Sequence, residues 1–121
     1  MGPVARRIDD VQGRTALLAW RGGDRGRTTT ATAVRWTLQR LAILSPGGSV
    51  EVRVPPFGVA QCIAGPRPTR GTPPNVVETD AATWLALVDG ATSWPDALAG
   101  GTVSASGQRA DLSGVLPLRT L

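Results

Sequence analysis

Side chains that could act as an acid, a base or a nucleophile are few in this 121-residue sequence. It contains no His, Lys or Tyr, which excludes a Ser-His or Cys-His nucleophile pair and a Schiff-base lysine. The single cysteine, Cys62, has no imidazole to deprotonate it, and we interpret it as a small core residue. Only carboxylates remain, the closest being Asp9 with Asp10 and Glu78 with Asp80. We therefore predict that the protein is not an enzyme, with a mechanism based on Asp and Glu alone as the open alternative.

Metal ligands and cofactor-binding signatures are equally scarce. Zinc and copper sites need clusters of Cys and His, and a Walker-type phosphate loop needs a Lys; the sequence has neither. We expect no metal and no cofactor. A single cysteine cannot form an internal disulfide, which indicates a reducing, cytoplasmic environment. The first residues, MGPVARRIDD, lack the apolar stretch of a secretory signal. No apolar run approaches the ~20 residues of a membrane span, so we expect no stable membrane insertion.

All thirteen basic residues are arginine, and the net charge is +4. Together with the abundance of Ala and Gly, this usage indicates a GC-rich coding genome. A basic chain invites a nucleic-acid interpretation, and RGGDRGR at 21–27 is similar to an Arg-Gly RNA-binding segment. Stacking aromatics are not interleaved with it, however, and no RNA- or DNA-binding motif follows. We interpret the segment as a linker between two helices and expect no nucleic-acid partner.

Two helices are predicted in the N-terminal part, and the second carries a tryptophan outside its main apolar stripe. Residues 8–20 form the first, with carboxylates in its first turn. Residues 28–44 form the second, with Thr28 or Thr29 as N-cap. Its main apolar stripe is Ala31, Val34, Leu38 and Leu41. Trp36 falls on the opposite side of that helix, where either the first helix covers it or it contacts a protein partner, a second copy of the chain or a ligand.

Alternation of apolar and polar residues then predicts a sheet. Strands are expected at 49–54, 58–64, 75–79 and 102–106. In the last of these, Val103 and Ala105 are expected to face inward. Asp80 is a plausible N-cap of a helix that Gly90 ends, and Ser93 opens a short helix to about Leu98. A last short helix is predicted from the apolar residues Leu112, Val115 and Leu116.

The C-terminal third resembles a known family. Residues 97–107, ALAGGTVSASG, resemble the sterol carrier protein 2 pattern Ala-aromatic-x-x-Gly-Lys-apolar-x-apolar-x-Gly, with Thr102 in place of the lysine. Upstream, TWLALVDG resembles a helix of that family. The stretch SVEVRVPPFGVAQCIAGPRPTRGTPPNVVETD looks like the small standalone bacterial sterol-carrier-type domains found in high-GC bacteria. The resemblance runs from about Ile8 to Leu118.

This resemblance implies an α+β fold in one domain, 1–121. The helical part would span 8–44, and the sheet with the C-terminal helices 45–118. A curved mixed sheet of about four to five strands would pack against helices on one face and enclose an apolar cavity. The implied function is non-enzymatic binding or transfer of a hydrophobic, lipid-like or sterol-like molecule. The alternative is a protein-interaction or scaffold module with a filled core, related to the C-terminal domain of mycothiol-dependent isomerase-like proteins.

Two sets of candidate binding residues follow from the sequence and the resemblance. The expected cavity lining is apolar: Val54, Phe57, Val77, Trp84, Val88, Leu98 and Leu112. The second set lies in the connection PRPTRGTPPN at 66–75, which is longer than an ordinary hairpin loop and is stiffened by four prolines. Its Arg67 and Arg70 could contact an anionic head group or an acidic partner. The alternative is a stiff crossover with solvated arginines.

Overall fold

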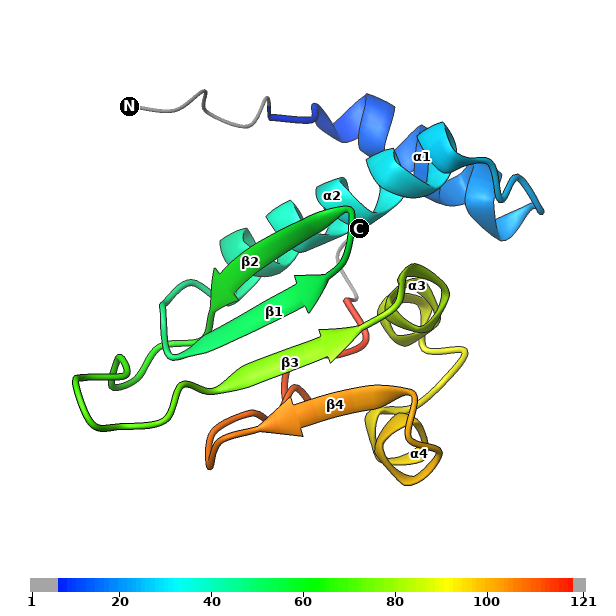
Figure 1. Ribbon diagram of the computed structural model, residues 1–121. Helices are drawn as coiled ribbons and strands as arrows, with labels where there is room; N and C mark the ends of the chain where they lie inside the picture. Colours follow the sequence, from blue (N-terminus) through cyan, green and yellow to red (C-terminus); the bar gives the residue numbers. More distant parts are fainter. Residues whose placement is uncertain (1–6, 119–121) are drawn as a thin grey trace.

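Helices and a mixed sheet make up the computed structural model, which describes residues 7–118 (Figure 1). The elements in chain order are α1 (Asp10–Arg21), α2 (Arg27–Leu44), β1 (Val50–Val54), β2 (Gly58–Cys62), β3 (Val76–Thr79), α3 (Ala81–Asp89), α4 (Trp94–Ala99) and β4 (Val103–Ser106). This arrangement confirms the predicted α+β class. The predicted strands and all but one of the predicted helices are present, with ends that differ by a few residues.

The four strands form one open sheet in the order β2-β1-β3-β4. β1 and β2 are an antiparallel hairpin, β3 runs parallel to β1, and β4 runs antiparallel to β3. β2 ends and β3 begins at the same end of the sheet, on opposite sides of β1, so residues 63–75 pass around the start of β1, and they do so without a helix. The proline-rich connection therefore joins two strands that are not neighbours in the sheet.

One face of the sheet carries the core. In β1, Val50, Val52 and Val54 are buried, whereas Glu51 and Arg53 point to the other, more exposed face. Figure 1 shows α2 behind β1 and β2, with α3 and α4 at the end of the sheet where β3 finishes and β4 begins. Alternate positions of the strands and the apolar sides of the helices thus meet in a single core.

Carboxylate and hydroxyl side chains begin three of the helices. Asp9 Oδ1 accepts a hydrogen bond from Gln12 N at 2.9 Å, and Asp80 Oδ1 accepts from Thr83 N at 2.7 Å. The hydroxyl of Ser93 accepts from Asp96 N at the start of α4. These bonds satisfy backbone N–H groups that a helix leaves without intrahelical partners. The predicted caps Asp80 and Ser93 are confirmed, and Asp9 and Asp80 have structural roles.

α1 lies across α2 and covers Trp36. The side chain of Trp36 is 0% exposed, and its ring packs directly on Gly13 of α1. Its indole Nε1 donates to Asp10 Oδ1 at 3.1 Å, so the polar edge of the ring is also satisfied. The expectation that the first helix covers Trp36 is confirmed. The alternative prediction, that Trp36 forms a docking face, is wrong, because no partner can reach the buried ring.

Two local predictions were wrong, and a third holds only in part. The N-cap of α2 is Gly26, not Thr28 or Thr29, since the Thr29 hydroxyl donates instead to Asp24 Oδ2 at 2.7 Å. Leu112 to Leu116 form a turn rather than a helix, with Val115 N and Leu116 N both bonded to Leu112 O. Ala105 points to the core side of the sheet as predicted, opposite the buried Val77 of β3, but it is exposed because only the first residue of β4, beside α4, is covered.

Candidate functional site

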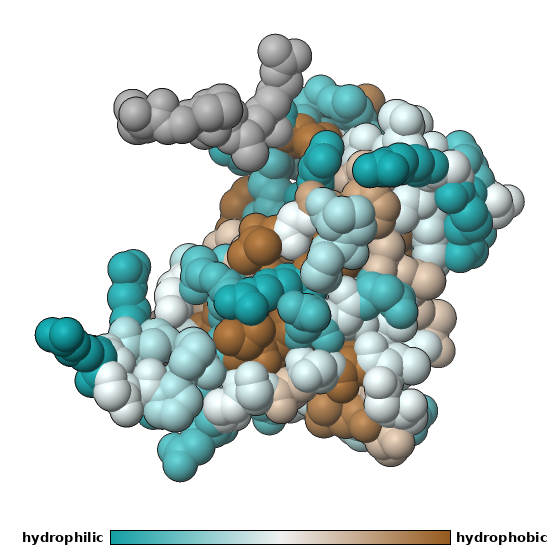
Figure 2. Space-filling model, viewed as in Figure 1, coloured by the Kyte–Doolittle hydropathy of each residue, from teal (hydrophilic) through white to brown (hydrophobic). Residues whose placement is uncertain are grey.

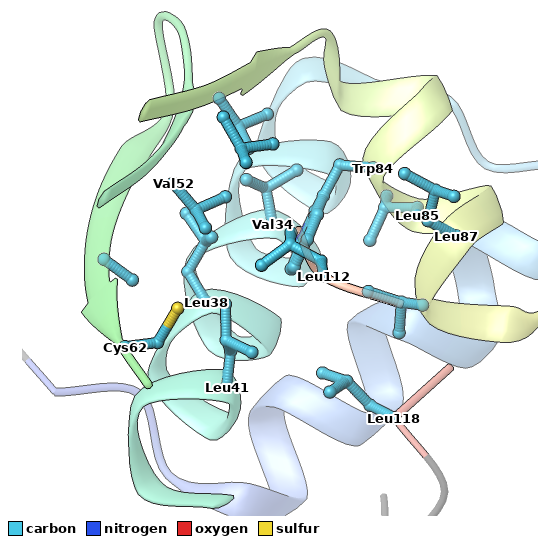
Figure 3. Packing of buried hydrophobic residues seen from close by; sticks show 14 of the residues in the cluster. Val34, Leu38, Leu41, Val52, Cys62, Trp84, Leu85, Leu87, Leu112 and Leu118 are labelled. Atoms are coloured by element: carbon cyan, nitrogen blue, oxygen red, sulfur yellow. The ribbon is translucent and has the colours of Figure 1, made fainter. Parts of the chain in front are cut away.

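Most of the predicted cavity residues are packed in the core. Val54, Val77, Trp84 and Leu112 are 0% exposed and Val88 is 1% exposed. A cavity large enough for a water molecule would expose the side chains that line it, so these five residues border no such cavity. Figure 3 shows Trp84 reaching from α3 toward α2, next to Val34 and Leu112.

The polar edge of Trp84 is satisfied inside this core. Its Nε1 donates to Thr37 Oγ1 at 2.9 Å, and the Thr37 hydroxyl donates to Ala33 O at 2.7 Å. Buried indole N–H groups usually need such a partner. The site around Trp84 is therefore complete without a ligand.

The remaining two predicted lining residues lie apart from that cluster. Leu98 is 42% exposed on α4. Phe57 is half-buried in the turn between β1 and β2, where it packs against the edge of the core. The structure therefore does not bring the seven residues together around one hollow. Contact of any of them with a ligand stays a prediction.

A more open apolar hollow lies where α2 passes the edge strand β2. It has a volume of about 550 Å³ and is lined on the helix by Arg35, Leu38, Gln39 and Ala42, on the hairpin by residues 57–61, and by Arg7 and Ile8 of the segment before α1. We call it the edge groove. Figure 2 shows apolar surface at the recess between the helices and the sheet on this side of the molecule. Its size is within the range of about 300–1,000 Å³ that is typical of ligand pockets.

Two polar side chains of α2 fix the walls of the edge groove. Arg35 Nε donates to Phe57 O at 3.0 Å and ties the hairpin turn to the helix. Gln39 accepts from Ile8 N at 3.1 Å and donates to Ile8 O at 2.8 Å, which holds the segment before α1 at the other end. A groove whose walls are held by hydrogen bonds needs little ordering to accept a ligand. Of the residues that line the edge groove, only Phe57 was predicted from the sequence as a binding residue.

The proline-rich connection forms a second hollow, of about 280 Å³, with the segment that follows β4. Arg67 lines this hollow as one of two arginines, and the other is Arg109 rather than the predicted Arg70. Arg70 is exposed and lies outside this hollow and the adjoining one under residues 47–49. The structure thus places Arg67 with a residue far away in the sequence rather than with Arg70, and Arg109 was missed.

Residues 26–118 match the family described as the bacterial SCP ortholog, where SCP denotes sterol carrier protein. The chain belongs to this family. The match covers the sheet, α2 and the C-terminal helices, in agreement with the resemblance of the C-terminal third. No protein of curated function matches the chain.

One departure of this bacterial sterol carrier-type domain from the wider pattern has a structural explanation. Thr102 stands at the position of the sterol carrier lysine. Its backbone oxygen accepts from Thr79 Oγ1 at 2.7 Å, and its own hydroxyl donates to Ala97 O at 3.2 Å. The position links β3 and α4 to the start of β4 and presents no cation to a ligand.

Two carboxyl groups of this sterol carrier-type domain have pKa values that hydrogen bonds shift. Hydrogen bonds from Thr29 and Gly26 N lower the pKa of Asp24, and bonds from Ser113 lower the pKa of Asp111. Neither carboxyl is therefore tuned toward neutral pH, as a general acid or base would be. Within residues 7–118 no three His, Cys, Asp or Glu side chains are grouped to hold a metal. Nor is any helix in that range long and apolar enough to cross a membrane.

Cys62 should be unreactive while the protein is folded. Its side chain is 0% exposed, and burial raises the pKa of the thiol to about 11, so little thiolate forms at neutral pH. We expect a disulfide reagent at about pH 8 to label Cys62 only after unfolding in urea, where the thiol pKa is about 8.5. Because the folded state keeps a proton that the unfolded state loses, stability should decline as the pH rises through about 9 to 11. Labelling of the folded protein as fast as in urea would contradict the burial of Cys62.

Proposed function

We propose that this protein binds the apolar part of a lipid-like or sterol-like molecule in the edge groove and releases it chemically unchanged. The observation that carries the proposal is the groove itself, with apolar walls from Leu38, Ala42 and Phe57 and a volume of about 550 Å³. Membership in the bacterial sterol carrier family supports a hydrophobic ligand.

The groove is favoured over the core because of the cost of opening the core. A ligand beside Trp84 would have to displace side chains that are in full contact, whereas the edge groove is already open. Burial of an alkyl chain contributes about 0.8 kcal/mol per methylene, against an association cost of at least about 4 kcal/mol. A medium-length chain in an open groove should therefore bind weakly and reversibly, which suits transfer.

The polar groups that line the groove favour binding of a ligand without a chemical reaction. Arg35 is occupied by Phe57 O, and Gln39 is occupied by the backbone of Ile8. The groove has no carboxylate among its lining residues, so the Asp/Glu mechanism left open by the sequence has no general acid there. The buried free thiol of Cys62 is in keeping with a reducing compartment such as the cytoplasm.

A polar group placed in the groove should weaken ligand binding. Ala42 lines the groove and is half-buried, so Ala42→Gln would set an amide against the alkyl chain. Burial of an unpartnered amide costs about 1–3 kcal/mol, which corresponds to a loss of about five- to 150-fold in affinity. Binding is measured by fluorescence titration with a labelled fatty acid. The matched control is Ile43→Gln, one residue along α2, 45% exposed and outside the groove. Equal losses in both variants would contradict the location.

The second candidate is a protein-interaction module, and the packed core favours it. Val77, Trp84 and Leu112 leave no room around them for a ligand, as expected of a domain whose core is filled by its own side chains. Native mass spectrometry of protein from its own host separates the two. A co-purified lipid that Ala42→Gln abolishes supports the carrier, whereas an associated protein and no lipid supports the module.

A further inference from the structure

One asparagine joins three loops at the end of the sheet opposite α3 and α4. Asn75 Nδ2 donates to Ser49 O at 2.9 Å, and its Oδ1 accepts from Arg109 N at 3.0 Å. Gly107, at φ +99°, lies against the same residue, and a Cβ there would be 2.8 Å from Pro74 O. The connection 66–75, the segment before β1 and the segment after β4 are thereby held together.

This arrangement places two guanidinium groups at the same hollow. Arg67 and Arg109 both line the hollow of about 280 Å³, together with Thr72 and Gln108. Arg67 lies over Gly48, with its Nε 3.0 Å from the position that a Cβ would take there, and Arg109 lies beside Gly65. Figure 1 shows the two loops at the same end of the sheet, and Figure 2 shows strongly hydrophilic side chains projecting there.

Neither guanidinium is neutralised within the described residues. The ion pairs found in 7–118 are Arg21 with Asp89 and Arg53 with Glu51. Glu51, which lines the adjoining hollow, also accepts from Gln61 Nε2 at 2.7 Å, so both of its oxygens are engaged. Two cations that share a hollow repel one another unless an anion lies between them.

We propose that the hollow between Arg67 and Arg109 binds an oxyanion, specifically a phosphate group. The planar guanidinium presents a fork of N–H donors that matches the oxygens of phosphate. The hydroxyl of Thr72 and the amide of Gln108 provide further donors at the rim. Prolines on both sides of Arg67 restrict the loop, so little conformational freedom is lost when the anion binds.

The phosphate could belong to the head group of an amphiphile or to a soluble phosphate compound, because both present the same oxygens. The site does not depend on the edge groove, since the two hollows have no lining residue in common. It can therefore exist even if no apolar ligand binds, and its test is separate.

The experiment is a titration of the full chain with inorganic phosphate, followed by amide chemical shifts at constant ionic strength. We expect saturable shifts centred on Gly48, Asn75, Gly107 and Arg109. Removal of a charge-assisted hydrogen bond reduces affinity by about tenfold or more, so Arg67→Gln and Arg109→Gln should each weaken binding to that extent. The matched control is Arg70→Gln, which removes the same charge from the same loop and should change the affinity by less than about twofold.

The result that would overturn the proposal is equal weakening by all three substitutions, or shifts that follow every exposed arginine without saturation. Either would mean that only the overall charge attracts phosphate. Unchanged amide shifts elsewhere in each variant establish that the fold is intact, so a loss of binding cannot be attributed to unfolding.

A second arm identifies the source of the phosphate. Short-chain phosphatidic acid is compared with inorganic phosphate and with phosphatidylcholine of the same chains. Tighter binding of phosphatidic acid through the same amides, lost in Arg109→Gln, assigns the site to a lipid head group. Equal binding of phosphatidic acid and inorganic phosphate assigns it to soluble phosphates. Equal binding of the two lipids, insensitive to Arg109→Gln, would contradict any contact between this site and a lipid head group.

Discussion

Replacement of Trp84 with alanine is expected to lower the free energy of unfolding by about 3–5 kcal/mol. The indole is 0% exposed and is enclosed by apolar side chains of α2, α3 and the sheet. Its removal forfeits those contacts and leaves a cavity that rigid neighbours fill only in part. A ring that bordered an empty ligand cavity would cost distinctly less, so the size of the loss measures how closed the core is.

Urea denaturation of matched variants separates packing from hydrogen bonding at this position. Trp84→Phe keeps most of the ring but removes the donor to Thr37 Oγ1. Thr37→Val keeps the volume but leaves the indole N–H buried without an acceptor, at a cost of about 1–3 kcal/mol. The double variant should be less destabilised than the sum, because the two residues form one interaction. A loss below about 1 kcal/mol for Trp84→Ala would contradict full packing.

Local patterns predicted the elements well because their causes are local. The alternation in β1 depends on neighbouring side chains pointing to opposite faces. The caps Asp80 and Ser93 are confirmed because their bonds span only three residues, Asp80 to Thr83 and Ser93 to Asp96. The N-cap of α2 was predicted wrongly because of another short-range interaction. Thr29 looked like a cap, but Asp24 formed a competing bond to its hydroxyl.

The candidate sites could not be predicted to the same extent, since they depend on contacts between distant segments. The edge groove exists because β2 is an edge strand that α2 passes, and strand order is not visible in local periodicity. Arg109 lies at the same hollow as Arg67 because β4 pairs with β3 and Asn75 accepts a hydrogen bond from Arg109 N, 34 positions away. The sequence showed that Trp36 needs an apolar partner outside the main stripe of α2. The residue against which its ring packs is Gly13. A glycine has no side chain, so hydrophobic periodicity could not identify it as the contact.

Gly13→Ala should therefore destabilise the protein by about 1–3 kcal/mol, the usual cost of overpacking a core. Helix propensity alone predicts the opposite, because alanine is favoured over glycine inside a helix by about 1 kcal/mol. A Cβ at Gly13 would overlap the indole ring of Trp36. Since Trp36 is 0% exposed and bonded to Asp10, the ring cannot move aside without separation of α1 from α2.

The control for this prediction is Gly22→Ala, at the end of the same helix. There a Cβ would lie 3.5 Å from the carbonyl oxygens of Leu18 and Ala19, an ordinary contact, and the residue already has a right-handed helical conformation. Its stability should change by no more than about 0.5 kcal/mol. The measurement is urea denaturation of both variants followed by tryptophan fluorescence. If Gly13→Ala were instead more stable than the parent, α1 would not be seated on Trp36, and a partner face on α2 would again be accessible.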